Sequence, residues 1–250
     1  MKNKILFLIF CLPFILKSQQ SSGEIKYEER IKIIIDLPEG NESFKKTLPP
    51  SQNILKTLLF TSNESYYRDD AKNEDLDITH EENGMDMQIV MKNPENNIYT
   101  NQEKNLLIQS TEFFGKQFLV TGDLSTKKWK LTDDQKMILG YPCQKAILMD
   151  TTLDVVAWFT PQIPIHIGPN GFTNLPGVIL RIEFDKDSRT ITATQLNFRN
   201  LKENEIIKPT KGKKLTAQEF KIIRDEKMKE MGMIQGKGGA VKMIIKEDRN

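Results

Sequence analysis

The chain has 250 residues, with 36 lysines and arginines against 34 aspartates and glutamates, so its formal net charge is +2. This near-balance argues against a nucleic-acid-binding protein, because such proteins usually carry a pronounced basic excess. Charged residues make up 28% of the chain and hydrophobic residues 38%, which is typical of a soluble globular protein. Two histidines and two cysteines leave little material for metal sites, disulfides or nucleophile–base pairs.

The first twenty residues have the pattern of a secretory signal peptide. Lys2 and Lys4 form a short basic region, residues 5–16 are apolar apart from Pro13, and polar sequence begins at Lys17. The apolar stretch is too short for a stable membrane anchor. Its removal leaves 33 basic and 34 acidic residues and one cysteine. We therefore expect an exported protein, in the periplasm or at the outer membrane, with no transmembrane segment after cleavage.

The clearest strand pattern lies in residues 23–36. Charged residues occupy most even positions, and apolar residues occupy the odd positions Ile25, Tyr27, Ile31, Ile33 and Ile35. This period of two predicts a strand with one buried face. A second strand is expected over 57–67. The acidic stretch that follows, residues 69–86, contains few aromatic residues and predicts a solvated loop.

Short β-type runs then recur at turn-punctuated spacing. They cover residues 87–91, 97–100, 106–114, 117–121, 128–131, 143–149, 153–159 and 177–184. Val178, Leu180, Ile182 and Phe184 alternate and are expected on one face. The residues between 149 and 153 suggest a hairpin. In residues 189–198 the apolar phase changes after Ala193, which predicts a bulge near Gln195.

Helix signals are concentrated near the C-terminus. Thr216 and Glu219 have the spacing of a capping box, and Phe220, Ile223 and Met231 follow roughly one stripe, so we expect a helix over 216–231. A flexible tail and a short strand over 241–245 would follow. The prediction is one mainly β (α+β) domain over 21–250: a curved antiparallel sheet or half-open barrel with a C-terminal helix.

Residues 160–177, here called the proline segment, contain four prolines and three glycines. Proline removes a backbone donor, so this stretch is not expected to be a central strand. Apolar residues are interleaved with the prolines and must be buried somewhere. We expect the segment either to close the open side of the sheet or to present a recognition surface.

Several motifs in and around this segment resemble one known family. They are Gly140-Tyr141-Pro142-Cys143-Gln144-Lys145-Ala146, Ala157-Trp158-Phe159-Thr160-Pro161, Ile163-Pro164, Gly168-Pro169 and Asn174-Leu175-Pro176-Gly177-Val178-Ile179-Leu180. In this order they resemble the GLPGLI family, which is named for the motif that the last group matches. The resemblance is dense from residue 129 to residue 184.

The chain departs from that family at Asn174, which replaces the first glycine of the naming motif. Asparagine is the next most tolerant residue if this position needs a positive φ. The resemblance implies export into the envelope of double-membraned bacteria. By analogy of fold it also implies a β architecture similar to periplasmic carriers of the lipoprotein-localisation type, in which a half-open barrel shelters acyl chains.

Catalytic and metal chemistry have weak support in the sequence. There is no Gly-x-Ser-x-Gly motif, and a hydrolase built on Cys143 and His166 would require an exposed thiol. A calcium site is an alternative interpretation of the acidic stretch, and a copper site is an alternative interpretation of the C-terminal methionines. The residues concerned are Asp75, Asp77, Glu81, Met228, Met231 and Met233. No catalytic residue, metal or cofactor is predicted, and the protein is not expected to be an enzyme.

The functional prediction is a non-catalytic binding or carrier protein for a hydrophobic or extended ligand, such as an acyl chain or a polypeptide segment. The candidate binding residues are Trp158, Ile163, Ile165, Gly168, Pro169, Phe172, Leu175, Pro176 and Gly177. The alternative is an interaction module that docks to an outer-membrane transporter or barrel partner. In that case the proline segment would be an exposed contact surface.

Overall fold

The computed structural model describes residues 21–33, 46–82, 85–91, 93–124, 127–149, 154–230 and 242–247; side chains are described in these ranges except for 80–89, 91 and 242–247. The expected signal peptide over residues 1–20, the end of the first predicted strand (34–36) and Met231 lie outside the described residues. Among the described residues, no helix has the length and apolar character needed to cross a membrane.

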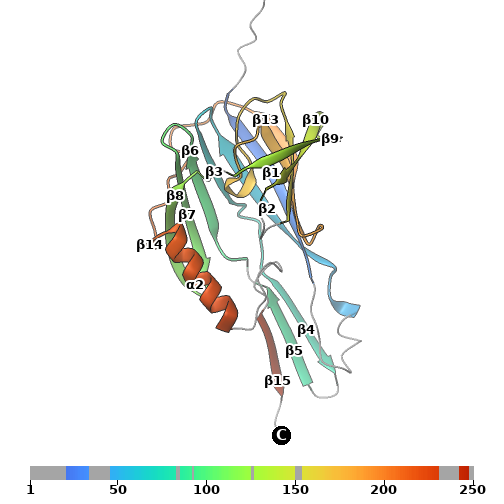
Figure 1. Cartoon of the computed structure of the whole chain (residues 1–250). Helices are drawn as coiled ribbons and strands as arrows, with labels where there is room; N and C mark the ends of the chain where they lie inside the picture. The colour runs from blue at the N-terminus through green and yellow to red at the C-terminus, as the bar shows by residue number, and fades with distance from the viewer. Residues whose placement is uncertain are drawn as a thin grey trace, which may run out of the picture.

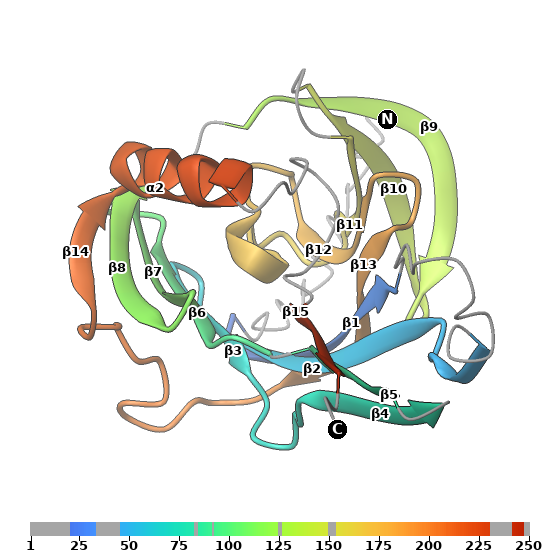
Figure 2. The same cartoon turned by 90° about the horizontal axis from the view of Figure 1, so that it is seen from below.

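Within the described residues, one large sheet of twelve strands dominates the fold, in the spatial order β14-β8-β7-β6-β3-β2-β1-β13-β12-β11-β10-β9. The strands are β1 Gly23–Lys32, β2 Ser51–Phe60, β3 Glu64–Asp69, β6 Asn96–Asn101, β7 Leu106–Phe113, β8 Lys116–Asp123, β9 Trp129–Ile138, β10 Tyr141–Leu148, β11 Val155–Thr160, β12 Val178–Phe184, β13 Arg189–Phe198 and β14 Lys213–Thr216. The sheet curls round, and its concave side encloses the connection between β11 and β12 (Figure 2). The expected mainly β fold with a curved sheet and a C-terminal helix is confirmed.

A second sheet of three strands, in the order β15-β5-β4, projects from one end of the molecule (Figure 1). Its strands are β4 Leu76–Glu82, β5 Met85–Met91 and β15 Lys242–Glu247. The prediction of a solvated loop over 69–86 is therefore wrong. Leu76 and Ile78 are half-buried while Asp77 and Thr79 are exposed, so alternation is present within the acidic run. Backbone pairing with β5 makes this stretch a strand despite its charge.

The single strand expected over 57–67 is also wrong, because residues 61–63 form a turn between β2 and β3. The Thr61 hydroxyl accepts hydrogen bonds from the backbone N–H groups of Asn63 (3.4 Å) and Glu64 (3.1 Å). Local side-chain capping of this kind ends a strand where hydrophobic periodicity gives no warning.

Bulges in β13 and β12 shape the sheet beside the concave side. Lys26 pairs with Gln195 and Tyr27 with Ala193, so β13 carries the bulge expected near Gln195. Trp158 of β11 pairs with Arg181 of β12, and the next residue, Phe159, pairs with Ile179. Leu180 is therefore an extra residue on β12. The phase change buries side chains on both faces of β12, whereas one buried face was expected; Val178, Ile179, Leu180 and Ile182 are all 0% exposed.

The C-terminal helix α2, Ala217–Glu230, begins at the expected capping box. The backbone N–H of Thr216 donates to Glu219 Oε2 (2.7 Å), and the backbone N–H of Glu219 donates to the Thr216 hydroxyl (3.2 Å). Phe220 packs against Phe118 of β8, with ring centroids 5.5 Å apart. The preceding strand β14 pairs with β8 in parallel, which differs from the all-antiparallel expectation.

Candidate functional site

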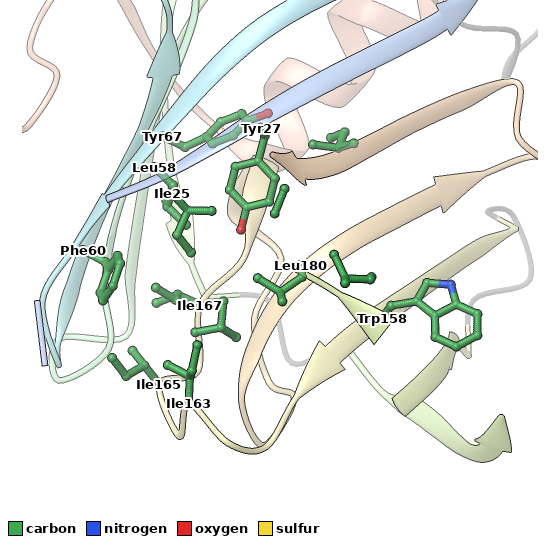
Figure 3. Packing of buried hydrophobic residues seen from close by; sticks show 14 of the residues in the cluster. Ile25, Tyr27, Leu58, Phe60, Tyr67, Trp158, Ile163, Ile165, Ile167 and Leu180 are labelled. Carbon is green, nitrogen blue, oxygen red and sulfur yellow. The ribbon is translucent and has the colours of Figure 1, made fainter. Parts of the chain in front are cut away.

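The proline segment fills the concave side of the sheet with its own apolar side chains. Ile163, Ile165 and Ile167 belong to the same buried cluster as Phe60 of β2 and Leu180 of β12, and they lie between these two residues in Figure 3. The other two apolar residues of the segment, Phe172 and Leu175, are 3% and 2% exposed in a neighbouring cluster. The segment therefore acts as a plug for the sheet.

Irregular backbone hydrogen bonds hold the proline segment in place. The N–H of Ile165 donates to Ile163 O (2.8 Å) and the N–H of Ile167 to Ile165 O (2.9 Å), which are successive three-residue turns. The N–H groups of Val178 and Ile179 donate to Ile163 O (3.1 Å) and Ile167 O (2.9 Å). The alternate residues Pro164 and His166 are exposed. These bonds replace the strand ladder that proline prevents.

Steric constraints explain Gly168 of the proline segment and both Asn174 and Gly177 of the naming motif. Gly177 has φ +154°, and a Cβ there would lie 2.0 Å from Thr160 O. A Cβ at Gly168 would lie 2.8 Å from the Ile179 side chain. Asn174 has φ 68°, so the positive φ considered for this position is present. The motif is thus explained by packing and backbone geometry.

The candidate residues are brought together by the structure, but as parts of the core. All of them except Pro176 are buried. Trp158 lies at the edge of the first cluster, where its indole N–H donates to Glu183 Oε1 (3.1 Å) and the Lys136 ammonium lies 3.8 Å from the ring centroid. A ligand-binding role for these residues stays a prediction.

The cysteine hydrolase alternative is wrong, because the exposed thiol that it requires is absent. Cys143 is 1% exposed, and its thiol contacts Tyr141 O at 3.5 Å. Burial raises the pKa of the Cys143 thiol to about 11, which opposes formation of the nucleophilic thiolate. Within the described part of the chain, no group of three or more histidine, cysteine or carboxylate side chains could hold a metal ion.

A second region of the concave side is polar, and we call it the polar cluster. It lies beyond the proline segment, toward the C-terminal end of β1. Its members come from six strands around the concave side, from the proline segment and from the approach to β6. They are Glu29, Lys56, Tyr67, Asp69, Asn93, Asn96, Gln109, Asn170 and Arg189.

Two ion pairs form the base of the polar cluster. Arg189 Nε donates to Glu29 Oε1 at 2.6 Å, with the two side chains 28% and 5% exposed. Lys56 of β2 pairs with Asp69 of β3, with side chains 5% and 20% exposed. Each buried charge has an opposite charge beside it, so the formal charge of the cluster is zero.

Amide side chains connect the Lys56–Asp69 pair to the proline segment. Gln109 Nε2 of β7 donates to Asn96 Oδ1 (2.8 Å), and Asn96 Nδ2 lies 3.3 Å from Asn170 Oδ1. Asn170 belongs to η1, the 3₁₀ turn Pro169–Gly171 of the proline segment. Asp69 also accepts hydrogen bonds from the backbone N–H of Asn96 (3.1 Å) and from Asn93 Nδ2 (3.3 Å). The amides are half-buried and offer both donors and acceptors.

Tyr67 is the unusual member of the polar cluster. Its side chain is 1% exposed, and its hydroxyl has no hydrogen-bond partner among the described residues. Burial, followed by the negative charge of Glu29, raises its pKa well above the usual range. Tyr27, by contrast, donates its hydroxyl proton to Ile179 O at 2.7 Å. Buried hydroxyl groups normally form hydrogen bonds. The Tyr67 hydroxyl is therefore expected to lower the stability of the fold.

The sequence contained one signal for this cluster. Glu29 occupies an odd position of the first strand, the phase of Ile25, Tyr27 and Ile31, and is 4% exposed. A carboxylate on a buried face needs a partner, so its position alone implied a cation opposite. The identity of that partner, Arg189, depends on the pairing of β1 with β13 and is not visible in the sequence.

Comparisons with known proteins agree with this architecture. A family model described as "N-glycanase peptide, N-terminal domain" matches residues 71–221. A solved structure of PNGF-II in space group P21 superposes with a TM-score of 0.50 at 17% identity, covering 81% of this chain and 33% of that chain. A second PNGF-II structure, in space group C2, gives 0.49 at 17% identity, with 81% and 32% covered. The chain thus spans about a third of the length of these structures.

None of the curated proteins matches the chain. The likeness to PNGF-II shows the fold, and the family model covers more than half of the residues. The chain therefore belongs to the family of the N-glycanase N-terminal domain.

Proposed function

We propose that this protein is a non-catalytic binding module of an exported protein, and that the polar cluster binds a neutral, hydroxyl-rich ligand such as the carbohydrate chain of a glycoprotein. One observation carries the proposal: a charge-balanced, half-buried set of donors and acceptors lies at one end of the concave side. Recognition sites hold such groups in fixed positions. Here ion pairs and hydrogen bonds between amide side chains fix them.

The accessible groups of the cluster suit hydroxyl groups on a ligand. Arg189 uses Nε for Glu29, and its two terminal nitrogens have no hydrogen-bond partner among the described residues. Asn96, Gln109 and Asn170 are half-buried and can both donate and accept. The Phe184 ring packs under the Arg189 guanidinium at 4.9 Å and adds an apolar surface. A sugar presents the same mixture of donors, acceptors and apolar C–H faces.

The balance of charge disfavours strongly charged ligands. Glu29 and Asp69 would repel an anion in a poorly solvated site, and Lys56 and Arg189 would repel a cation. A neutral polar ligand is repelled by neither set of charges. Its hydroxyl groups replace water at groups that already have fixed orientations.

Burial of the proline segment argues against the acyl-carrier version of the binding hypothesis. The apolar residues expected to line a hydrophobic wall are at most 9% exposed, because they pack against strands β1, β2 and β12. A binding role for an extended ligand is still supported. The proposed binding region is then the polar cluster and not the proline segment. The interaction-module alternative expected the proline segment to be an exposed contact surface, whereas its apolar side chains are buried.

Family membership and the N-terminal sequence support the remaining parts of the proposal. The family model carries the name of an N-glycanase, a class of enzyme that acts on protein-linked carbohydrate. The family model is described as an N-terminal domain, which supports a binding role for this chain. The basic and apolar N-terminal residues and the resemblance to the GLPGLI family support export to the cell envelope.

The test is titration of the full chain with free N-linked oligosaccharides, followed by calorimetry. Arg189→Met should lower the affinity by at least about tenfold, since it removes a charged donor from the site. Arg181→Met is a matched control, because Arg181 also pairs with a carboxylate at 2.6 Å (Glu183), is 24% exposed and lies on the neighbouring strand. The control should bind normally. Equal losses in both variants, or no binding by the wild type, would contradict the proposal.

A further inference from the structure

An exposed phenylalanine occupies a conformation that phenylalanine disfavours. Phe114 and Gly115 form the tip of the β7–β8 hairpin, between the paired residues Phe113 and Lys116. Phe114 has φ 50° and is 41% exposed, and Gly115 has φ 73°. Tight hairpin turns with positive φ at both positions favour asparagine followed by glycine. A bulky side chain here costs stability and also exposes apolar surface.

Lysines gather beside this hairpin tip. The segment from 206 to 212 runs past the outer side of β7 and β8: Ile206 packs on the cluster that contains Leu119, and Lys211 O lies 3.5 Å from the Ser110 hydroxyl. Strand β14 then pairs Lys213 with Phe118 of β8. This places β14, β8, β7 and α2 along one side of the molecule (Figure 1). The exposed lysines of this region are Lys116, Lys208, Lys211, Lys213 and Lys214.

The positive charge of this region exceeds the negative charge beside it. No acidic residue occurs from Ile206 to Gln218. Among the described residues, none of the five lysines forms an ion pair, whereas Lys221 of α2 pairs with Asp225. Of the nearby carboxylates, Glu219 accepts hydrogen bonds from the Thr216 backbone and hydroxyl (2.7 and 2.9 Å). Glu219 does interact electrostatically with Lys213, but the five lysines outnumber it and give the region a net positive charge.

We propose that these five lysines, together with Phe114 and the 54% exposed Ile207, form a docking surface for an anionic lipid membrane. We call this surface the basic corner. Lysines near a bilayer bind its anionic headgroups, and exposed aromatic and aliphatic side chains enter the interfacial region beside them. This inference is independent of the polar cluster, which lies on the concave side.

Lysines on an edge strand also prevent edge-to-edge aggregation, and that role explains Lys213 and Lys214. It does not explain a strained, exposed phenylalanine at the hairpin tip or the lysines that lie outside the edge strand. Membrane docking accounts for both features, because it needs apolar and basic side chains together.

Co-sedimentation with vesicles tests the proposal. The full chain should bind phosphatidylcholine vesicles that contain about one third phosphatidylglycerol, and binding to pure phosphatidylcholine should be far weaker. Lys116→Gln with Lys213→Gln should reduce the affinity by about 25-fold, at roughly fivefold for each lysine. Raising the salt concentration should reduce binding by the wild type.

Two further variants make the test specific. Lys128→Gln with Lys130→Gln removes the same charge from exposed positions at the opposite edge of the sheet and should bind as the wild type does. Phe114→Asn should weaken vesicle binding several-fold and raise the thermal unfolding midpoint, since asparagine suits the turn. Equal binding to neutral and anionic vesicles, or an equal loss in the control pair, would overturn the proposal. So would unchanged vesicle binding by Phe114→Asn together with equally tight binding to dextran sulfate, which would indicate a soluble polyanion.

Discussion

The two regions of the concave side are built on the same strands but have opposite chemistry. On β1, Ile25 and Tyr27 pack with the proline segment, while Glu29, two residues further on the same face, pairs with Arg189. On β2, Leu58 and Phe60 belong to the apolar cluster, whereas Lys56 pairs with Asp69. Position along a strand therefore decides whether a side chain stabilises the fold or forms the polar cluster.

The energetic consequences of the two regions differ as well. Buried isoleucine and phenylalanine side chains each contribute about 1.5–3 kcal/mol through removal of apolar surface from water. A buried ion pair contributes little net stability, because desolvation offsets the attraction between the charges. The Tyr67 hydroxyl, which has no hydrogen-bond partner in the described part of the chain, lowers stability. A fold that keeps a polar region of this kind beside a filled apolar one points to function in the polar region.

The largest expected effect concerns closure of the apolar region. Gly177→Ala should lower the free energy of unfolding by at least about 3 kcal/mol, because the new Cβ would meet Thr160 O at 2.0 Å. Urea unfolding followed by circular dichroism measures the loss. Gly140→Ala is the control: it also has a positive φ (+80°), but no atom lies within 4 Å of its Cβ. A control as unstable as Gly177→Ala would show that φ, and not the close approach, sets the cost.

An effect of intermediate size concerns how well the apolar region excludes solvent, which the reactivity of the Cys143 thiol measures. With its pKa raised from 9.0 to about 11, the native thiol holds about 100-fold less thiolate near neutral pH than the unfolded chain. Alkylation by iodoacetamide at pH 8 should be slower by at least that factor in the native protein. Because the thiol pKa is raised, stability from this group is present below about pH 9 and is lost as the pH rises toward 11. Rapid native alkylation would show that the apolar region opens easily.

The smallest effect distinguishes the polar cluster from the apolar region. Tyr67→Phe should raise the free energy of unfolding by about 1 kcal/mol, because it removes a buried hydroxyl that has no hydrogen-bond partner among the described residues. The matched variant Tyr27→Phe should lower it by about 1 kcal/mol, since the Tyr27 hydroxyl donates to Ile179 O. Thermal and urea unfolding of the two variants give the comparison. Destabilisation by Tyr67→Phe would mean that the hydroxyl is satisfied, by water for example.

Much of the fold can be predicted from the sequence because strand periodicity is a local pattern. The alternation from Ile25 to Ile31, the phase change at Gln195 and the capping box at Thr216 each depend on neighbours within a few residues. The predictions for residues 57–67 and 69–86 were wrong because side-chain capping and backbone pairing decided the structure there, and not local composition. Thr61 ends β2 through its hydroxyl, and the acidic residues near Asp77 join a strand because β5 satisfies their backbone groups.

The candidate site was only partly predictable for a related reason. The proline segment was recognised as unusual, and the sequence left open whether it was surface or wall. Its burial depends on contacts with β1 and β2, more than a hundred residues earlier in the chain. The polar cluster joins Glu29 to a partner 160 residues away, and Asn96 to Asn170 across 74 residues. Local sequence carries no record of such pairings.

By itself, the sequence determined the β character of the chain, the bulge in β13, the start of the C-terminal helix and the presence of a rigid apolar segment, because each follows from local backbone and hydrophobic preferences. Only the tertiary structure decided that the segment fills the sheet, that Cys143 is sealed, and that a charge-balanced polar cluster lies beside the plug. Burial and charge pairing depend on which strands become neighbours, and a sheet of twelve strands sets that order through long-range pairing.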